Sequence, residues 1–422
     1  MNNKKIITPI KVISGSLEVP SSKSYAQRAI ALSSLSRSEI ELEHLTYCDD
    51  VVAAIDVARE LGSSVNQNGR TVRISGGFDS GKAYAINCGE AGLSTRLFSA
   101  FSLLSTSEFK VSGSGSILSR PMDMVVDAME QAGKNVTSNG GKLPLSITGK
   151  TNSKVLEIDG STSSQLLTGL LIVAPFLPVD LTIKVNDLKS IPYVEMTLET
   201  LRSFGLIIEN NNFGSFTCKG NQSIDRPIVY DVEGDWSGAS FLIVAGLVGG
   251  KVLLKGLKKE SLQADIAILK VADEVGGKLH WEGNDLIVEK DQLKPFCVDA
   301  TNCPDLFPPL VALAAMINGE SRISGVHRLK HKESDRASAL IKEFTTLGIN
   351  VFRENDELVI TGLRDKERIN GAEVFAHGDH RMAMALALMS IRSKKEIAIN
   401  GADSIAKSYP GFYDDLTSIT AK

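Results

Sequence analysis

The sequence predicts an α/β (α+β) fold of two similar domains, each built from three repeated units. Two observations support this prediction. Five glycines (Gly62, Gly133, Gly205, Gly276 and Gly348) recur at intervals of 71 or 72 residues, and a short strand of alternating apolar and polar residues recurs six times. A period of this length is typical of a supersecondary unit that is repeated along the chain.

Each of the five glycines lies between an apolar helix end and a pair of short strands. A glycine in this place suits the left-handed cap of a helix, and the hairpin after it needs a neighbouring unit to cover its apolar face. The five segments are ARELGSSVNQNGRTVRISG, MEQAGKNVTSNGGKLPLSITG, LRSFGLIIENNNFGSFTCKG, ADEVGGKLHWEGNDLIVEK and FTTLGINVFRENDELVITG.

The six alternating strands imply a sixth unit that has no hairpin of its own. These strands are SEIELEHL, SEFKVSGS, DLTIKVND, GKVLLKGL, ESRISGV and KEIAINGA. A sixth glycine would fall near residue 420, where the chain ends, so the leading segment IITPIKVISGSLEVP is predicted to supply the missing hairpin. Three units per half give an N-terminal domain at 20–234 and a C-terminal domain at 1–19 plus 235–422.

Composition excludes several classes of protein. With 46 basic and 50 acidic residues the net charge is −4, which argues against a nucleic-acid groove. The five cysteines are scattered without a C-x-x-C pair, and the histidines show no metal-ligand spacing, so we expect neither a disulfide framework nor a metal. The start MNNKKIITPIKV lacks an apolar signal region, and the longest apolar stretch, 166–178, is too short to span a bilayer. We therefore expect a cytoplasmic protein.

The segment VPSSKSYAQRAIAL predicts an anion site at a helix start. Ser24 with Gln27 fits a capping box, which places the first helical residue near Tyr25. Lys23 and Arg28 would then lie beside the positive end of the helix dipole. The alternative is a capped surface helix that carries two solvated cations.

Other helix starts in the first half carry similar groups. In CGEAGLSTRLF, Gly92 lets the backbone approach a ligand, and Arg96 is expected to begin the next helix. Arg120 precedes a proline that suits a first helical turn. The segment 163–165 (Ser-Ser-Gln) offers donors for phosphate or hydroxyl oxygens, although plain capping would explain it equally well.

Charged groups in the second half follow the same pattern. HRLKHKESDRASAL places Lys332 and Arg336 four residues apart on one predicted helical face, with Glu333 beside them. Asp305 lies behind a proline at a helix start in NCPDLFPPLVAL. A solvated charged face is the alternative explanation.

Two further cations lie near the C-terminus. GDHRMAMALALM places Arg381 at the start of an apolar helix, with Asp379 or Gly378 available as the cap. Lys407 in AKSYPGFYDDL comes just before the last predicted helix.

Taken in order, these motifs resemble the 3-phosphoshikimate 1-carboxyvinyltransferase (EPSP synthase) family from about residue 15 to 415. They are P-S-S-K-S-x-x-x-R, G-x-A-G-x-x-x-R, R-P, S-S-Q, S-x-P-Y, P-D, K-E-S-D-R, D-H-R-M-A-M and A-K-S-Y-P. The resemblance implies the enolpyruvyl transferase fold, an inside-out α/β barrel with three βαβαββ-type units in each of two domains. It also implies a monomer that uses no cofactor and whose domains close over the substrates.

The reaction implied by the resemblance transfers the enolpyruvyl group of phosphoenolpyruvate to the 5-hydroxyl of shikimate 3-phosphate and releases phosphate. Asp305 would take the hydroxyl proton, and either Glu333 or Lys23 would handle the methyl proton. The residues implied for shikimate 3-phosphate are Lys23, Ser24, Arg28, Ser163, Ser164, Gln165, Ser190, Tyr193, Asp305 and Lys332. Those implied for phosphoenolpyruvate are Lys23, Gly92, Arg96, Arg120, Gln165, Arg336, Arg381 and Lys407.

The residues of this chain differ from those expected for two alternative functions. The sister enzyme that transfers enolpyruvyl to UDP-N-acetylglucosamine uses a cysteine before the R-P pair, whereas the loop here reads SGSGSILSRP. A non-catalytic anion-binding protein on the same fold would be expected to lose Asp305 or Glu333, and both are present.

The chain departs from the family pattern around the first glycine pair. It has Glu90 and Leu93 where the family has asparagine and threonine. A carboxylate at position 90 would repel the phosphate of phosphoenolpyruvate unless a cation pairs with it. The bulk of Leu93 would narrow the space that glyphosate, the family's longer inhibitor, requires. We therefore expect weak inhibition by glyphosate.

Overall fold

The computed structural model describes residues 3–161, 163–330 and 332–421, which form two compact units. The N-terminal unit is Ser21–Val232, and the C-terminal unit combines Met1–Pro20 with Glu233–Lys422. We propose that these units are the two domains, whose boundaries differ by one or two residues from the predicted ranges 20–234 and 1–19 plus 235–422.

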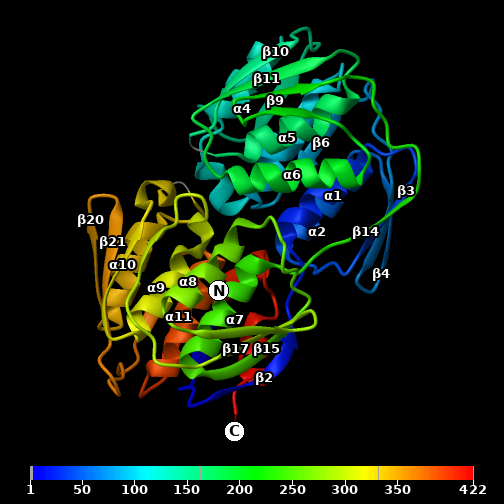
Figure 1. Cartoon of the computed structure of the whole chain (residues 1–422). Coiled ribbons are helices and arrows are strands. Elements are labelled where there is room, and N and C mark those ends of the chain that lie inside the picture. Colours follow the sequence, from blue (N-terminus) through cyan, green and yellow to red (C-terminus); the bar gives the residue numbers. More distant parts are fainter. Residues whose placement is uncertain (1–2, 162, 331, 422) are drawn as a thin grey trace. The chain divides into compact units, whose positions relative to one another are not determined.

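The N-terminal unit contains three four-stranded sheets among its described residues (Figure 1). Their strand orders are β14-β3-β5-β4, β6-β7-β9-β8 and β10-β11-β13-β12. The strands are β3 (Glu39–Glu43), β4 (Ser64–Asn68), β5 (Thr71–Ser75), β6 (Tyr84–Asn87), β7 (Phe109–Ser112), β8 (Asn135–Ser138), β9 (Leu145–Thr148), β10 (Val155–Asp159), β11 (Leu181–Asn186), β12 (Glu209–Asn211), β13 (Ser215–Cys218) and β14 (Ile228–Asp231).

The described part of the C-terminal unit also contains three sheets, two with four strands and one with three. Their orders are β16-β17-β15-β2, β18-β19-β21-β20 and β1-β23-β22. The strands are β1 (Lys4–Ile7), β2 (Ile13–Glu18), β15 (Gly250–Lys255), β16 (Lys278–Glu282), β17 (Asp285–Glu289), β18 (Cys297–Asp299), β19 (Gly319–Ser324), β20 (Asn350–Glu354), β21 (Glu357–Gly362), β22 (Glu373–Phe375) and β23 (Ile397–Asn400).

Five of the six described sheets share one topology, and the sixth has the single strand β1 in place of the hairpin, which confirms the predicted repeat. Each begins with a parallel pair at one edge, and the second strand of that pair is one of the six predicted alternating strands. The five predicted hairpins all form. The five repeat glycines have φ between 80° and 92°, as a left-handed helix cap requires.

The leading segment differs in part from the prediction. β1 pairs antiparallel with β23 and so completes the sixth sheet, as expected. β2 does not form a hairpin with it, because β2 pairs in parallel with β15 and begins the first sheet of the same unit. In the N-terminal unit the corresponding edge strand is β14. It comes from the end of the unit and pairs in parallel with β3.

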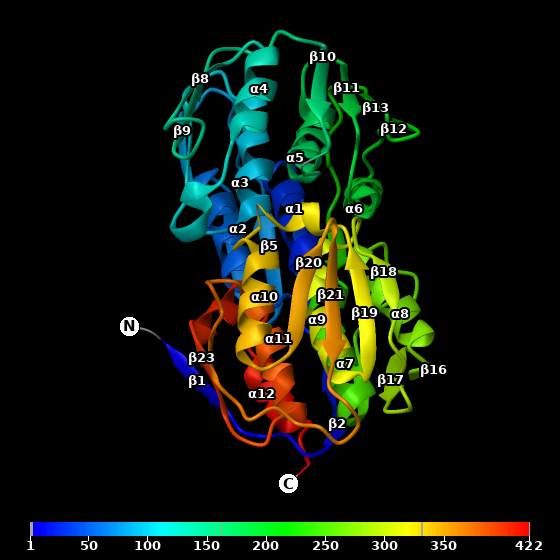
Figure 2. The same cartoon turned by 90° about the vertical axis from the view of Figure 1, so that its left-hand side faces the viewer.

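Three helices form the buried centre of each unit, and the sheets and remaining helices cover them. Figure 2 shows one of the covering helices, α4 (Asp123–Gln131), between strands β8 and β9 on one side and strands β10 and β11 on the other. The central helices are α1 (Lys23–Ser34), α3 (Gly92–Ser99) and α5 (Gln165–Val173) in the N-terminal unit, and α7 (Trp236–Gly249), α9 (Phe307–Met316) and α11 (His380–Leu388) in the C-terminal unit. The outer helices are α2 (Asp49–Glu60), α4 (Asp123–Gln131), α6 (Ile191–Ser203), α8 (Ile268–Glu274), α10 (Arg336–Thr346) and α12 (Phe412–Ser418).

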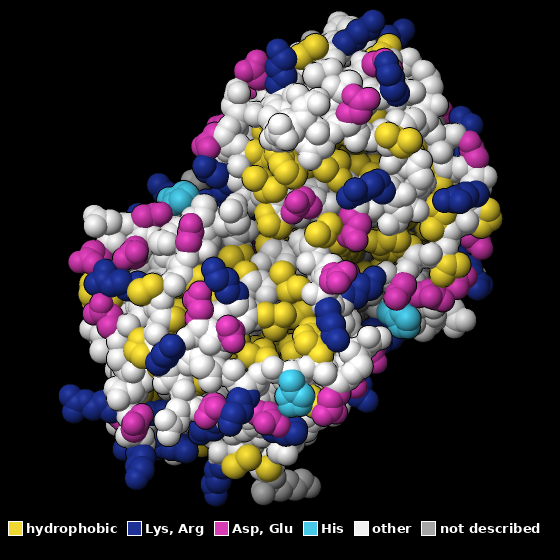
Figure 3. Space-filling view, viewed as in Figure 1, with side chains coloured by type: hydrophobic (Ala, Val, Ile, Leu, Met, Phe, Trp, Pro, Cys, Tyr) yellow, Lys and Arg dark blue, Asp and Glu magenta, His cyan; other side chains and the backbone are white. Residues whose placement is uncertain are grey.

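The surface carries charges of both signs. On the face shown in Figure 3, Lys and Arg side chains alternate with Asp and Glu side chains over both units, without a continuous basic stripe. In the described ranges, no helix has both the length and the apolar character needed to cross a bilayer.

Candidate active site

The central helices of the N-terminal unit are partly exposed, and only at their first residues. Every residue of α1, α3 and α5 is buried except Lys23 and Ser24, Gly92 and Leu93, and Gln165. These are the first one or two residues of the three helices. The N–H groups of a first helical turn have no carbonyl partner within the helix and carry its positive dipole end, so these exposed ends suit anions.

Helix α1 begins two residues earlier than predicted. Its cap is Ser22, whose carbonyl accepts the N–H of Ala26, and no side chain caps the helix. The capping box of Ser24 and Gln27 is therefore wrong, because Gln27 bonds instead to the carbonyl of Lys23 and to the hydroxyl of Ser94 in α3.

Lys23, the first residue of α1, forms an ion pair with the start of α2. Its Nζ lies 2.6 Å from Oδ2 of Asp50, and both side chains are mostly buried. The carboxylate fixes the ammonium group at the helix end. A substrate anion at this place would share Lys23 with Asp50.

Arg28 is buried and linked to two other helices. Its guanidinium donates to the hydroxyls of Thr197 and Thr168 and to the carbonyls of Ser24 and Tyr193, at 2.7 to 3.3 Å. Burial lowers its pKa to about 10, so it stays charged at neutral pH. Arg28 was expected to bind substrate, and in this structure its hydrogen bonds join α1 to α5 and α6.

A second group in this unit joins Gly92, Arg96, Arg120 and Gln165. Arg96 donates to the Gly92 carbonyl at 3.2 Å and to the Gln165 side chain at 3.1 Å. Arg120 lies so close to Gly92 that a Cβ built there would stand 2.4 Å from its Nη1. The structure thus brings together four of the residues that the resemblance implies for phosphoenolpyruvate.

The positions of two arginines along their helices differ from the prediction. Arg96 lies one turn inside α3, which begins at Gly92. Arg120 ends the 3₁₀ helix η2 (Gly115–Ser119) as its C-cap and lies three residues before α4, so Pro121 is not in a first helical turn. Both side chains still reach the start of α3.

The remaining polar residues of this unit lie at the starts of α5 and α6. Ser164 is the cap residue of α5, and the hydroxyl of Ser163 accepts the N–H of Gln165 at 3.2 Å. Ser190 is the cap residue of α6 with a left-handed backbone (φ 58°). The N–H of Tyr193 donates to the carbonyl of Ser190.

Asp305 is the centre of the charged cluster in the C-terminal unit. It lies in η5 (Pro304–Leu306), directly before α9, as the sequence predicted. Its Oδ1 accepts from Arg336 at 2.9 Å and lies 3.4 Å from Nζ of Lys332, and its Oδ2 lies 3.0 Å from Arg381. Burial raises the pKa of Asp305, but the three cations outweigh this and hold it well below the usual range.

Arg336 is fully buried among carboxylates. Its Nε donates to Asp379 at 2.9 Å, and its Nη2 lies 2.6 Å from Glu333. Burial lowers the pKa of Arg336, but Asp379, Glu333 and Asp305 together raise it above its ordinary value. The predicted pair of Lys332 and Arg336 on one helical face is wrong, because Asp335 caps α10 and leaves Lys332 before the helix.

Arg381 lies in the first turn of α11 and is held on three sides. Asp379 caps the helix by accepting the Arg381 N–H. The guanidinium donates to the Ser237 hydroxyl at 2.8 Å, lies 2.6 Å from Nε2 of His380, and pairs with Asp305. These contacts join the first turns of α7 and α11 to Asp305.

Lys407 lies at the end of η8 (Ala402–Lys407), five residues before α12. Its Nζ donates to the carbonyl of Gly378 at 2.8 Å. The carbonyl belongs to the connection that leads into α11, so Lys407 is tied to the same connection as Asp379.

Asp265 is a buried carboxyl near this cluster that the sequence analysis did not single out. It lies in η4 (Ala264–Ala267) and is 4% exposed. Burial, followed by the charge of Asp305, raises its pKa to about 7. Two neighbouring carboxyls whose pKa values move in opposite directions are typical of an acid–base site.

We expect Asp265→Asn to stabilise the protein at high pH. Because the pKa of Asp265 is raised above the unfolded value of about 4, the folded state retains a proton that the unfolded state releases. The free energy of unfolding therefore falls as pH rises from about 4 to about 7 and stays low above that. The variant should gain roughly 1–4 kcal/mol over the wild type at pH 8. Thermal melts at pH 5 and pH 8 check this, and an equal difference at both would contradict it.

Together these groups can bind anions and move a proton. Each unit gathers cations at helix starts, and the C-terminal unit adds a carboxylate that is ionised and held by three cations. Among the described residues no cluster of three or more His, Cys, Asp or Glu could hold a metal ion.

Several partners of the predicted residues were not found from the sequence. They are Asp50, Ser237, Asp265 and, as a partner of Arg336, Asp379. A signal existed only for Asp379, which the sequence offered as a helix cap. Asp50 lies 27 residues from its partner Lys23, and Ser237 lies 144 residues from its partner Arg381. The charge of Asp305 acts on Asp265. The spacing of motifs contains no information on such pairs.

Comparison with known proteins identifies the family. The family model for EPSP synthase (3-phosphoshikimate 1-carboxyvinyltransferase) matches residues 7–416. The 3-phosphoshikimate 1-carboxyvinyltransferase of Clostridium perfringens (strain 13 / Type A) is 35% identical over 421 residues, covering 99% of this chain and 98% of the relative. That of Clostridium acetobutylicum is 34% identical over 414 residues, covering 96% and 95%.

Solved structures show the same fold. The EPSP synthase of Acinetobacter baumannii superposes with a TM-score of 0.82 at 23% identity, covering 100% of this chain and 98% of that one. The enolpyruvyl transferase NikO of Streptomyces tendae gives 0.79 at 16% identity, covering 100% and 98%. The fold is thus the predicted enolpyruvyl transferase fold, and the chain belongs to the EPSP synthase (3-phosphoshikimate 1-carboxyvinyltransferase) family.

Proposed function

We propose that this protein transfers the enolpyruvyl group of phosphoenolpyruvate to the 5-hydroxyl of shikimate 3-phosphate, which releases phosphate. The observation that carries the proposal is the carboxylate of Asp305, held by three cations at the start of α9. A reaction between two polyanions needs cations to bind them and a base to activate the hydroxyl, and this cluster offers both.

Most of the cations are assigned to one of the two substrates, and Lys23 is assigned to both. For phosphoenolpyruvate we propose the group of Gly92, Arg96, Arg120 and Gln165, with Lys23 and the three cations Arg336, Arg381 and Lys407. For shikimate 3-phosphate we propose Lys23, Ser24, Arg28, Ser163, Ser164, Gln165, Ser190, Tyr193, Asp305 and Lys332. Support comes from the geometry, since the first group is joined by hydrogen bonds at the start of α3.

Substrate binding would make Asp305 a better base. In the structure its charge is neutralised by Arg336, Arg381 and Lys332, which depress its pKa. When substrate phosphate and carboxylate groups take part of the charge of these cations, the pKa of Asp305 rises toward the range in which it accepts a proton. The base is thereby activated most when both anions are bound.

The methyl proton has two candidate carriers. The Glu333 carboxylate pairs with Arg336 at 2.6 Å, and the Lys23 ammonium pairs with Asp50 at 2.6 Å. A general acid must hold a proton before the step, and the ammonium group that pairs with Asp50 carries one. Glu333, paired with an arginine, would first have to gain one.

One assay tests the proposed function against its nearest alternative. Phosphate release from phosphoenolpyruvate is measured with shikimate 3-phosphate or with UDP-N-acetylglucosamine as the acceptor. Release only with shikimate 3-phosphate supports the proposal, and release only with the sugar nucleotide would assign the sister activity. No release with either would favour a protein that binds anions without catalysis.

We expect weak inhibition by glyphosate because of the residues around Gly92. The carboxylate of Glu90 accepts hydrogen bonds from the N–H and hydroxyl of Ser116 and lies against Gly115. Glu90 thereby joins the loop that leads to Arg120 to the turn before α3. Leu93 follows Gly92 at the start of this helix. Competition against phosphoenolpyruvate is measured for the wild type and for Glu90→Asn/Leu93→Thr. Tight inhibition of the wild type, or unchanged inhibition of the double variant, would contradict the expectation.

We also propose that the protein acts as a monomer in the cytoplasm. Each substrate group named above is assigned to residues of one chain, which fits a monomer.

A further inference from the structure

Glu343, which the proposed mechanism does not use, is a buried carboxylate on α10. It is 1% exposed and lies seven residues after Arg336, so two helical turns place both side chains on one face of the helix. Its Oε2 accepts the N–H of Phe375 at 3.0 Å, and its Oε1 lies 2.7 Å from Nε2 of His377. Glu343 therefore holds the beginning of the connection from β22 to α11.

The other end of this connection is held by the same helix face. Asp379 accepts from Nε of Arg336 at 2.9 Å and from the hydroxyl of Ser334 at 3.2 Å. Between the two attachments, His377 and Gly378 have φ of 55° and 66°. A histidine in the left-handed region costs free energy and is retained only where the surroundings fix it.

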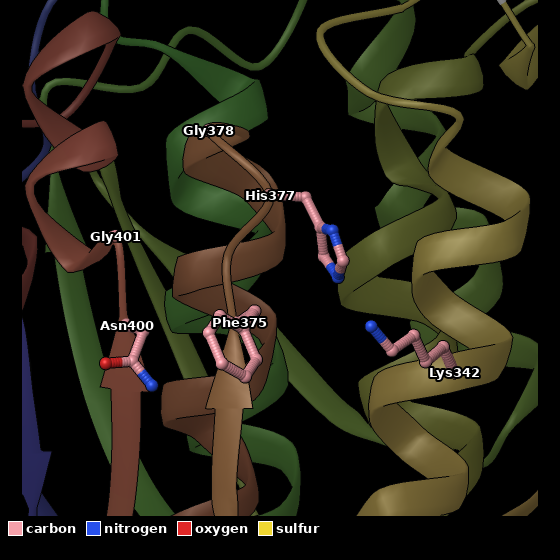
Figure 4. Close-up of a pocket in the computed structure, with 6 residues that line it drawn as sticks. All are labelled: Lys342, Phe375, His377, Gly378, Asn400 and Gly401. Carbon is pink, nitrogen blue, oxygen red and sulfur yellow. The ribbon is translucent and has the colours of Figure 1, made fainter. Parts of the chain in front are cut away.

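Packing alone does not fix this segment. Figure 4 shows the His377 ring projecting from the connection toward α10, beside a cavity of about 280 Å³. The cavity is lined by Lys342, Phe375, His377, Gly378, Asn400 and Gly401. Because one side of the connection borders open space, the two hydrogen bonds to Glu343 take a larger share in fixing its path.

Three site cations depend on the path of this connection. Asp379 binds Arg336 and caps α11, whose first turn contains Arg381, and the carbonyl of Gly378 accepts from Lys407. Arg336, Arg381 and Lys407 are the three cations of the C-terminal unit that we assign to phosphoenolpyruvate. A shift of the connection would move all three together.

We propose that Glu343, through His377 and the Phe375 N–H, is a positioning residue for the phosphoenolpyruvate-binding cations of the C-terminal unit. This inference rests on the proposed function. Glu343 itself does not contact the substrate, because it is buried behind the connection. A misplacement of about 1 Å in a binding group can cost about 100-fold in rate, so the effect of losing Glu343 should be measurable.

The test compares the two substrates in full-length Glu343→Ala and Glu343→Gln variants. We expect Glu343→Ala to raise KM for phosphoenolpyruvate about tenfold or more, because misplaced cations bind this substrate less well. KM for shikimate 3-phosphate should stay within about twofold of the wild-type value. Glu343→Gln keeps the acceptor for the Phe375 N–H and should give a smaller rise. His377→Asn keeps a residue that tolerates positive φ and removes the imidazole, so it should resemble Glu343→Gln.

Glu373→Gln is the matched control. Glu373 is a carboxylate on β22 that bonds to Asn400 and Lys4 and not to the connection. It should leave both KM values unchanged. An equal rise in both KM values in the Glu343 variants, or no rise in either, would overturn the inference. If Glu343→Ala does not fold, an unchanged KM for phosphoenolpyruvate in Glu343→Gln and His377→Asn would overturn it equally.

A binding measurement separates this inference from the proposed function. Calorimetric titration with phosphoenolpyruvate in the presence of shikimate 3-phosphate reports affinity without turnover. A wild type that binds neither substrate would contradict the proposed function, and this inference with it. A wild type that binds both, with the same affinity in Glu343→Ala, would contradict this inference alone.

Discussion

Replacing Asp305 by alanine is expected to lower kcat by about 10²–10⁴-fold, the usual contribution of a positioned base. Asp305 is the carboxylate in the C-terminal unit that joins Lys332, Arg336 and Arg381. The three cations keep it ionised and aimed, so its loss removes the proton acceptor. The cations themselves remain available to substrate anions, and KM should change much less than kcat. Steady-state kinetics with both substrates check this split.

Asp305→Asn separates the base from the charge cluster. The amide keeps the shape and can still accept hydrogen bonds, but it cannot take a proton at neutral pH. Both variants leave three cations close together without their carboxylate, so thermal melts must accompany the kinetics. An effect confined to KM in a folded variant would make Asp305 a binding group only.

The repeat predicted the fold because its signals are local. A glycine after an apolar helix, followed by two alternating strands and a polar turn, determines a helix end and a hairpin within about twenty residues of chain. The position of β2 could not be predicted in this way. Its partner β15 lies more than 200 residues away along the chain. β15 pairs with β17 on one side and with β2 on the other.

Helix starts were the less predictable part. Ser24 has the right residue type for a cap, but tertiary contacts decided otherwise, because Gln27 bonds across to Ser94 on α3. In K-E-S-D-R, Asp335 has the residue type of a helix cap, and as the cap it places Lys332 before the helix. The spacing of Lys332 and Arg336 instead suggested one shared helical face, which is wrong. The cations, Asp305 and Glu333 were found from their motifs, whereas Asp50 as the partner of Lys23 and Asp379 as the partner of Arg336 required the structure.

Two cations of the site are buried, and their partners explain how a charge can be held there. Arg336 is 0% exposed, and Arg381 is 5% exposed. An unpaired charge in such a place would be costly, and each is instead paired and hydrogen-bonded. Charges preorganised in this way do not need to reorient when an anion arrives, which is the feature that makes them effective in catalysis.

Replacing Arg381 by alanine is expected to lower kcat/KM for phosphoenolpyruvate by about 10²–10³-fold, as for the loss of one preorganised donor to a developing charge. Arg381 is fixed by Ser237, His380 and Asp305, and α11 begins beneath it with Asp379 as its cap. Arg381→Lys should restore little activity, because an ammonium group cannot reach both Ser237 and Asp305 as the planar guanidinium does.

Arg322→Ala is the control for Arg381→Ala, because Arg322 also joins several carboxylates in the same unit. It pairs with Glu320, Glu354 and Glu357 on the sheet of β19 and is partly exposed. Its loss should leave kcat/KM unchanged within about twofold, since exposed ion pairs contribute little. Near wild-type kinetics for a folded Arg381→Ala would show that Arg381 does not bind the substrate. A comparable loss in Arg322→Ala would show that the effect of either arginine is a general consequence of breaking a charge cluster.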